Sequence, residues 1–185
     1  MAKDRGPDPQ RLDVAAFAAA GGALAAQTPQ ARFARLSSSL LALPGDRLPP
    51  PVDWSANGET RPVPGGARAN WVHLQAQTEV TLQCQRCLQA MQQALAVDRW
   101  FHFVGDEDEA ARLDEDSEDD VLAASSRFDL LELLEDELIL ALPIVPRHEQ
   151  CPQPLPMGAD EPLADEEAPN PFAALAALRR PPPGD

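Results

Sequence analysis

Residues 72–84 read VHLQAQTEVTLQC, and this stretch decides the fold. Every second residue from Val72 to Cys84 is apolar or small, whereas polar side chains from His73 to Gln83 fill the alternate positions. Because successive side chains of a β-strand point to opposite faces, this period predicts a strand with one buried and one wet face. Such a strand is typical of an antiparallel sheet that is covered on one side only.

A β-hairpin is predicted from the residues that follow this strand. Cys84 and Cys87 form a Cys-x-x-Cys pair, and a second extended segment runs from about residue 91 to residue 104. Four apolar residues of that segment share one parity, and Arg99 breaks their row: Leu95, Val97, Phe101 and Phe103. We therefore expect a hairpin that carries both cysteines at its tip.

The chain before the hairpin predicts two helices and a short strand. An alanine-rich run over residues 15–26 favours a helix, although two glycines weaken it. A second helix is expected over residues 29–36, where a Thr-Pro pair suits its start. Residues 52–56 alternate between apolar and polar side chains, which predicts a strand. Residues 1–10 are expected to be disordered.

An acidic block separates the hairpin from the next helix. Residues 105–120 hold ten acidic side chains and one arginine. Such a block repels itself and has little apolar surface to bury, so we expect a disordered linker at residues 105–125.

A leucine-rich helix is predicted after this linker. Asp129 and Glu132 have the spacing of a capping box, and Pro143 ends the pattern. The leucine stripe of this helix should pack on the apolar face of the sheet. Three acidic residues are expected to face water: Glu132, Glu135 and Asp136.

The coarse class is therefore α+β, with an antiparallel sheet packed with helices, an acidic disordered excursion and a C-terminal tail with a short helix. We expect a single α+β domain over residues 11–151. Residues 152–185 form a tail rich in proline and acid, and Asn170-Pro171 suits the start of its short helix.

Charge is distributed unevenly along the chain. Residues 1–100 carry ten basic and eight acidic side chains, whereas residues 101–185 carry five basic and 22 acidic ones, within a net charge of −15. The acidic half should repel bare RNA, because nucleic-acid affinity comes largely from neutralising phosphates. That half suits basic partners.

Composition also restricts the compartment and the chemistry. The three cysteines fit a reducing compartment, and no stretch approaches the ~18 apolar residues of a membrane span. We therefore expect a cytoplasmic protein without membrane association. Gly-x-Ser-x-Gly, a Walker loop and Gly-x-Gly-x-x-Gly are absent, so we expect neither catalytic residues nor a small-molecule substrate.

Cys84 and Cys87 are the sharpest local motif, because two thiolates at this spacing can bind one zinc ion. A structural zinc takes four ligands, and His148 with Cys151 would complete a Cys₃His set. Unmetallated, buried thiols remain an alternative. A thioredoxin-type redox pair is a weaker one, because the motif lies at a hairpin. Structural zinc is thus the one cofactor that the sequence suggests.

Histidine, tryptophan and arginine side chains are further candidates for catalysis or for contact with RNA. His73 and His102 lie on strand-like segments, where we expect surface or hydrogen-bonded residues and not general bases. The three tryptophans suit core packing or cover of a strand edge, with stacking on nucleobases as the less favoured alternative. Arg86 lies within the exposed turn and is the best candidate for a phosphate contact.

Three blocks of this sequence together resemble the YceD family, the large ribosomal RNA subunit accumulation proteins. The first is VTLQCQRCL at residues 80–88. The second is DLLELLEDELILALPIVP at residues 129–146, followed by His148 and Cys151. The third is NPFAAL at residues 170–175. The resemblance covers roughly residues 70–180.

This resemblance implies a non-enzymatic accessory factor that supports the synthesis, processing or stability of 23S rRNA in large-subunit biogenesis. It implies 23S rRNA or a pre-50S particle as partner, and basic ribosomal proteins suit the acidic half of the chain. The alternative is a zinc-stapled protein-interaction module that does not touch RNA.

Overall fold

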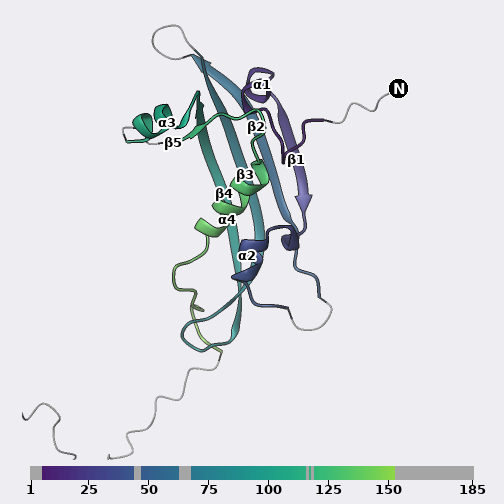
Figure 1. Ribbon diagram of the computed structural model, residues 1–185. Coiled ribbons are helices and arrows are strands. Elements are labelled where there is room, and N and C mark those ends of the chain that lie inside the picture. Colours follow the sequence, from purple (N-terminus) through teal and green to yellow (C-terminus); the bar gives the residue numbers. More distant parts are fainter. Residues whose placement is uncertain (1–5, 44–46, 63–67, 116, 118, 153–185) are drawn as a thin grey trace, which may run out of the picture. The chain divides into compact units, whose positions relative to one another are not determined.

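One sheet of five strands organises the protein, and its strands lie side by side in chain order (Figure 1). The first four strands pair antiparallel, whereas the fifth pairs parallel with the fourth. The strands are β1 (Ala23–Thr28), β2 (Val52–Pro62), β3 (Arg68–Gln83), β4 (Ala90–Val104) and β5 (Asp120–Ala123). The computed structural model describes residues 6–43, 47–62, 68–115, 117 and 119–152, which belong to one compact unit ending at Pro152.

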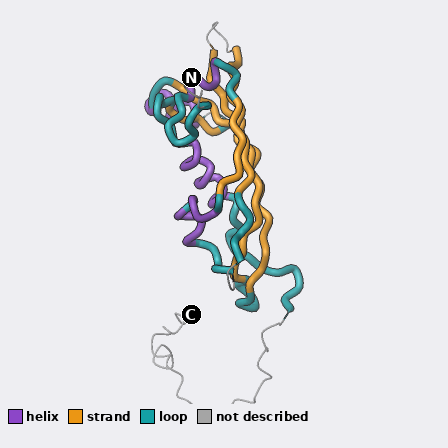
Figure 2. The backbone as a smooth tube through the Cα atoms, turned by 90° about the vertical axis from the view of Figure 1, so that its right-hand side faces the viewer, coloured by secondary structure: helices purple, strands orange, loops and turns teal. Residues whose placement is uncertain are grey.

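Helices lie against one face of the sheet, and in the described part of the chain the other face carries none (Figure 2). The helices are α1 (Val14–Ala19), α2 (Ala34–Ser38), α3 (Glu107–Asp114) and α4 (Leu130–Leu140), with a 3₁₀ turn, η1 (Gln30–Arg32), before α2. The side of the sheet without helices is called the open face below.

The β3–β4 hairpin supplies much of the core, as predicted. The four residues of the predicted β4 row are each at most 6% exposed: Leu95, Val97, Phe101 and Phe103. Leu130, Leu134 and Leu138 of α4 are fully buried against this face. Burial of each leucine contributes about 2 kcal/mol. The α+β class is confirmed, although the sheet is mixed because β5 runs parallel to β4.

The two helices predicted near the N-terminus are shorter than expected. The first ends at Ala19, because Gly21 adopts a φ of +60° and the chain then turns back as β1. The Gly22 carbonyl accepts a hydrogen bond from the Gly58 N–H, which joins this turn to the end of the β1–β2 pairing. The helix expected over residues 29–36 splits into η1 and α2, because Phe33 between them has extended ψ.

The prediction of a disordered acidic linker is wrong for residues 107–114 and 120–123, which form α3 and β5. Asp106 caps α3 by accepting a hydrogen bond from the Glu109 N–H. A small, separate apolar cluster is buried here, and it consists of Val104, Ala110 and Val121. Pairing with the edge of β4 and these few apolar contacts order a segment whose composition alone favours disorder.

Glu135 was expected to face water, but its side chain is buried. One carboxylate oxygen accepts hydrogen bonds from the backbone N–H groups of Arg35 (2.6 Å) and Leu36 (3.1 Å). The other accepts from the Arg35 guanidinium at 3.2 Å. Glu135 therefore caps the N-terminus of α2 from the neighbouring helix α4, which ties the two helices together.

The structure describes residues 6–10 near the N-terminal end but not residues 153–185 at the C-terminal end. Pro9 lies in the stretch expected to be disordered, yet its carbonyl accepts a hydrogen bond from the Leu130 N–H at 2.8 Å. Residues 153–185, with the predicted helix after Asn170, lie outside the described residues.

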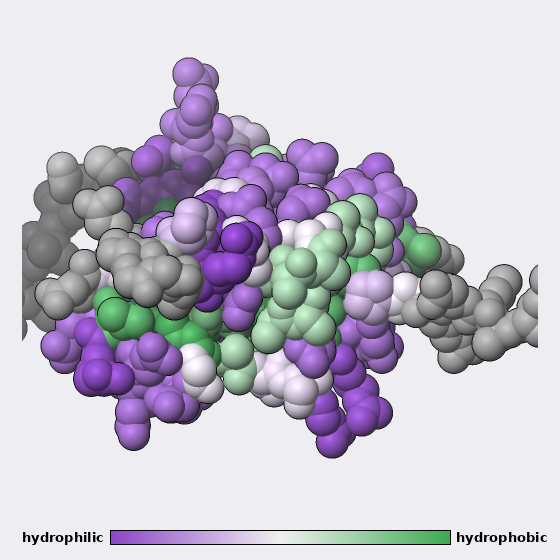
Figure 3. Space-filling view, turned by 90° about the horizontal axis from the view of Figure 1, so that it is seen from above, coloured by the Kyte–Doolittle hydropathy of each residue, from purple (hydrophilic) through white to green (hydrophobic). Residues whose placement is uncertain are grey.

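Seen from above, the surface is mostly hydrophilic with smaller apolar areas (Figure 3). Among the described residues, no helix has both the length and the apolar composition needed to cross a membrane.

Candidate metal centre

The turn between β3 and β4 holds the two cysteines of the Cys-x-x-Cys pair. The Cys84 N–H donates to the Gln89 carbonyl, and the Leu88 N–H donates to the Cys84 carbonyl, both at 2.9 Å. Leu88 has a φ of +60°, a left-handed conformation that closes the turn. The turn buries Cys84 (0% exposed) and Cys87 (4%) and leaves Arg86 exposed between them.

The segment after α4 returns to this turn (Figure 1). The Gln85 N–H donates to the Pro146 carbonyl at 2.8 Å, which joins two segments that are 61 residues apart in the sequence. The His148 N–H then points at the Cys84 sulfur, 3.4 Å away. These contacts place His148 and Cys151 beside the hairpin tip, where the sequence predicted that they meet the cysteine pair.

The four predicted ligand atoms converge. The Sγ atoms of Cys84 and Cys151 are 3.9 Å apart, and the Cys87 Sγ is 3.4 Å from the His148 Nδ1. All four ligand atoms lie within 4.8 Å of one another. Zinc–sulfur and zinc–nitrogen bonds of tetrahedral sites imply S–S and S–N separations of about 3.8 and 3.5 Å. The donor set and the two short separations therefore fit a tetrahedral Cys₃His zinc site.

Backbone donors favour the thiolate form of Cys84. Burial by itself raises the pKa of this thiol, but N–H groups of Cys87, His148 and Arg86 point at its sulfur and lower the pKa to about 5. A thiolate is the form that binds metal. The turn thus prepares one negatively charged sulfur before any cation arrives.

Cys151 has the opposite tendency. Burial, followed by hydrogen bonding and charge repulsion from Cys87 and Cys84, raises the pKa of Cys151 to about 11. A second or third thiolate in so small a space needs a cation to offset the repulsion. The site is therefore matched to a divalent metal and poorly matched to three free thiolates.

The remaining sequence candidates lie elsewhere. Trp54 faces the core side and donates its Nε1–H to the Thr28 hydroxyl at 2.9 Å. His73 and His102 lie on the open face, each stacked on a tryptophan. This stacked cluster also contains Arg61, which the sequence reasoning missed. The shared parity of residues 71, 73, 100 and 102 was the available signal for it.

Comparisons with known proteins agree with the sequence resemblance. The family described as large ribosomal RNA subunit accumulation protein YceD matches residues 72–179. A Haemophilus influenzae protein named "Large ribosomal RNA subunit accumulation protein YceD" is 39% identical over 108 residues, which cover 56% of this chain and 62% of that protein. The match thus spans less than two thirds of that curated relative. No solved structure matches this chain.

Proposed function

Since the chain belongs to the YceD family, we propose that it is an accessory factor for accumulation of large-subunit ribosomal RNA and not an enzyme. The observation that carries this proposal is the family match over residues 72–179. That range holds most of the hairpin, α4 and all four residues of the candidate metal centre. In finer terms, we propose that it supports the synthesis, processing or stability of 23S rRNA in the cytoplasm.

The proposed partners are 23S rRNA, a pre-50S particle and basic ribosomal proteins. The net charge of −15 disfavours indiscriminate binding to RNA, because the chain as a whole repels phosphates. The same charge attracts basic proteins. A factor of this charge can approach a pre-ribosomal particle through its basic proteins and contact RNA through a limited surface.

We propose a structural role for zinc at Cys84, Cys87, His148 and Cys151. When bound, zinc would supply a Lewis-acidic cation that neutralises the thiolates and holds four ligands. The four residues come from the hairpin tip and from the segment after α4, so binding would fix these two segments together. The role is mechanical, because all four ligand positions are taken by protein atoms.

The proposed contact surface surrounds this metal centre. Arg86 is exposed at the hairpin tip and can reach a phosphate. Leu88 (57% exposed), Val145 (46%) and Ile144 (101%) add apolar surface nearby, since Pro146 is bonded to the same turn. Exposed apolar side chains beside an exposed arginine suit a surface that becomes covered in an assembly.

These apolar residues also favour a second candidate function. A zinc-stapled module that binds one protein partner without touching RNA would use Leu88, Val145 and Ile144 in place of Arg86. Crosslinking in living cells separates the two functions, because direct RNA contact leaves crosslinked large-subunit rRNA on the protein and the module leaves none.

The test of the proposed function is affinity capture from growing cells, with RNA sequencing and protein identification. We expect enrichment of large-subunit rRNA and large-subunit proteins. Arg86→Gln should reduce the crosslinked rRNA several-fold, whereas Arg127→Gln, a loss of one exposed arginine elsewhere, should not. Capture without any large-subunit component would refute the proposed function.

A further inference from the structure

The open face of the sheet carries a row of aromatic and polar side chains. Residues of one parity on β3 point to it, and their β4 partners are set by the register: Trp71 opposite His102, His73 opposite Trp100, and Gln75 opposite Asp98. In the described part of the chain no helix covers this face (Figure 2). Large aromatic rings on an uncovered face are available to a partner.

The four rings form two cross-strand stacks. Trp71 and His102 have ring centroids 4.7 Å apart and an interplanar angle of 8°. His73 and Trp100 are 4.2 Å apart at 5°. All four side chains are only half-buried. Packing that served only to protect the core would place these rings on the opposite face, where the helices lie.

Arg61 joins both stacks. Its guanidinium carbon is 4.4 Å from the ring centroid of Trp71 and 4.1 Å from that of Trp100. The side chain is 37% exposed and is also paired with Glu59. A guanidinium that lies over two rings and stays partly exposed offers a flat, charged surface on which a base can stack. Arg61, Trp71, His73, Trp100 and His102 are called the stacked cluster.

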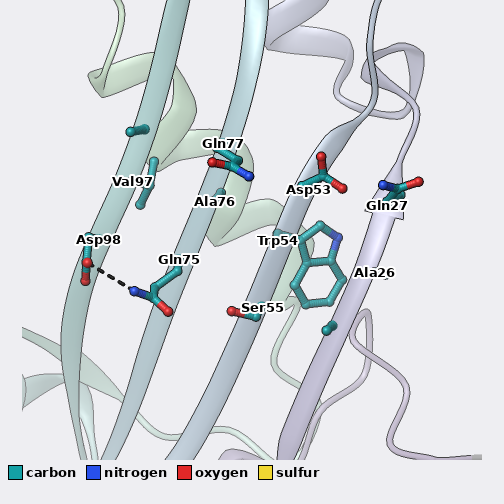
Figure 4. A pocket seen from close by; sticks show the side chains of 12 residues that line it. Ala26, Gln27, Asp53, Trp54, Ser55, Gln75, Ala76, Gln77, Val97 and Asp98 are labelled. Carbon is teal, nitrogen blue, oxygen red and sulfur yellow. Dashed lines mark hydrogen bonds between the residues drawn. The ribbon is translucent and has the colours of Figure 1, made fainter.

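A hollow lies on the open face beside the stacked cluster, and Figure 4 shows the side chains that line it. Its volume is about 680 Å³, and most of its surface is apolar. The polar side chains in its lining are Gln27, Asp53, Ser55, Gln75, Gln77 and Asp98. Gln75 Nε2 donates to Asp98 at 3.1 Å, and His73 bonds the other oxygen of the same carboxylate at 2.6 Å. Amide side chains both donate and accept, which is what recognition of a base edge requires.

We propose that the stacked cluster and the adjoining hollow bind unstacked bases of single-stranded RNA. The inference rests on the proposed function, because it names the RNA feature that such a factor would recognise. A base would stack on the exposed side of the Arg61 guanidinium, and its edge would lie towards Gln75 and Gln77. Duplex RNA would not bind here, since its bases are already stacked on each other.

Two observations favour a base over a basic peptide. The position that a partner's arginine would take, over both tryptophan rings, is filled by Arg61. Two carboxylates beside the cluster are also engaged, Glu59 with Arg61 and Asp98 with His73 and Gln75. At the stacked cluster, a lysine or arginine side chain would therefore have to displace contacts that already exist, whereas a base on the exposed side of the Arg61 guanidinium would not.

The stacked cluster is distant from the metal centre. Val72, near the cluster, and Cys84, just after β3, are twelve positions apart, which amounts to about 40 Å of extended chain. Substitutions in one region can therefore be made without touching the other. Binding at the cluster should depend weakly on salt, because stacking and amide hydrogen bonds neutralise few phosphates and so release few counterions.

The test measures binding of the full-length chain to single-stranded oligoadenosine and oligouridine of about a dozen nucleotides. Tryptophan fluorescence and a salt series are the readouts. Arg61→Gln and Trp100→Leu should each weaken binding about tenfold, the order expected for the loss of one stacking partner. Arg68→Gln is the matched control, because Arg68 is also an exposed arginine near this end but bonds Thr60 and touches no ring of the cluster. Circular dichroism and thermal melting verify that each variant is folded.

Each outcome has a defined meaning. Equal affinity of the wild type, Arg61→Gln and Trp100→Leu would overturn the proposal, and so would failure of the wild type to bind single-stranded RNA. Displacement of the RNA by a short arginine-rich peptide, with tighter peptide binding that Trp100→Leu abolishes, would assign the surface to a protein instead. In all three cases capture of large-subunit rRNA from cells still decides the proposed function separately, because it does not require the stacked cluster.

Discussion

The sulfur of Cys84 lies 3.9 Å from the sulfur of Cys151, although 67 residues separate them in the sequence. The intervening chain includes β4, α3, β5 and α4, so this contact closes about half of the described chain into one loop. A ligand set with such a separation stabilises the folded state by restricting a long segment of the unfolded chain.

We expect the purified chain to bind one zinc ion. His148→Gln should lower the zinc content well below one per chain, because it removes the Nδ1 atom that lies 3.4 Å from the Cys87 sulfur. Elemental analysis of both proteins measures this. His73→Gln is the control and should keep the full content, since His73 lies on the open face. Equal zinc content in the two variants would contradict the site.

Removal of the metal should destabilise the protein. A ligand that binds only the folded state adds about 4 kcal/mol when its free concentration is a thousandfold above Kd. We expect a strong chelator to lower the thermal midpoint of the wild type clearly. Cys84→Ser should start from the lower midpoint and show no further change with chelator. If the chelator leaves the thermal midpoint of the wild type unchanged, no structural metal is present.

Glu135 should contribute to the stability of the folded protein, because its carboxylate is buried and hydrogen-bonded. Glu135→Ala removes the acceptor for two N–H groups of α2 and leaves them without that partner. We expect a loss of about 2 kcal/mol, the order of a charge-assisted hydrogen bond and a helix cap. Glu132→Ala is the control, because Glu132 is exposed, and it should change stability by less than about 0.5 kcal/mol. Urea denaturation measures both.

Glu137 should make stability depend on pH. Burial raises the pKa of its carboxyl, and the charge of Arg99 opposes this shift only in part. The folded state therefore binds the Glu137 proton more tightly than the unfolded state, so stability falls as pH rises from 4.5 through the folded pKa. Glu137→Gln should remove this loss and be more stable than the wild type at pH 7.

At pH 4 the two proteins should differ little, because Glu137 is then protonated in the wild type as well. Denaturant midpoints at both pH values measure the effect. A variant less stable than the wild type at pH 7 would mean that the ionised carboxylate of Glu137 is stabilised by its surroundings.

The hairpin and the leucine-rich helix could be predicted because their signals are local. The alternation of apolar and polar residues over 72–84 is typical of a strand with one buried face. Asp129 was recognised as a helix cap by its spacing alone, and its carboxylate does accept hydrogen bonds from Leu131 and Glu132. The Cys-x-x-Cys motif, together with His148 and Cys151, named the four side chains that the structure brings together.

Predictions from the sequence were wrong where a segment distant in the chain determines the local conformation. Residues 120–123 become a strand only because the edge of β4 is free to pair with them. Glu135 is buried only because the N-terminus of α2 lies against α4, and helix periodicity cannot report which residues of another helix lie there. Arg61 reaches the rings of Trp71 and Trp100 across neighbouring strands, through a register that no single strand encodes.

The sequence by itself determined the strand period, the helix caps and the identity of the four candidate metal ligands. The period and the caps depend on residues that are close together in the chain, and the ligands form two local pairs, Cys84 with Cys87 and His148 with Cys151. Only the tertiary structure decided which ligand atoms meet, which acidic residues are buried and which rings stack. Those outcomes depend on pairing and packing between segments tens of residues apart, whose free energy appears only when the whole sheet has formed.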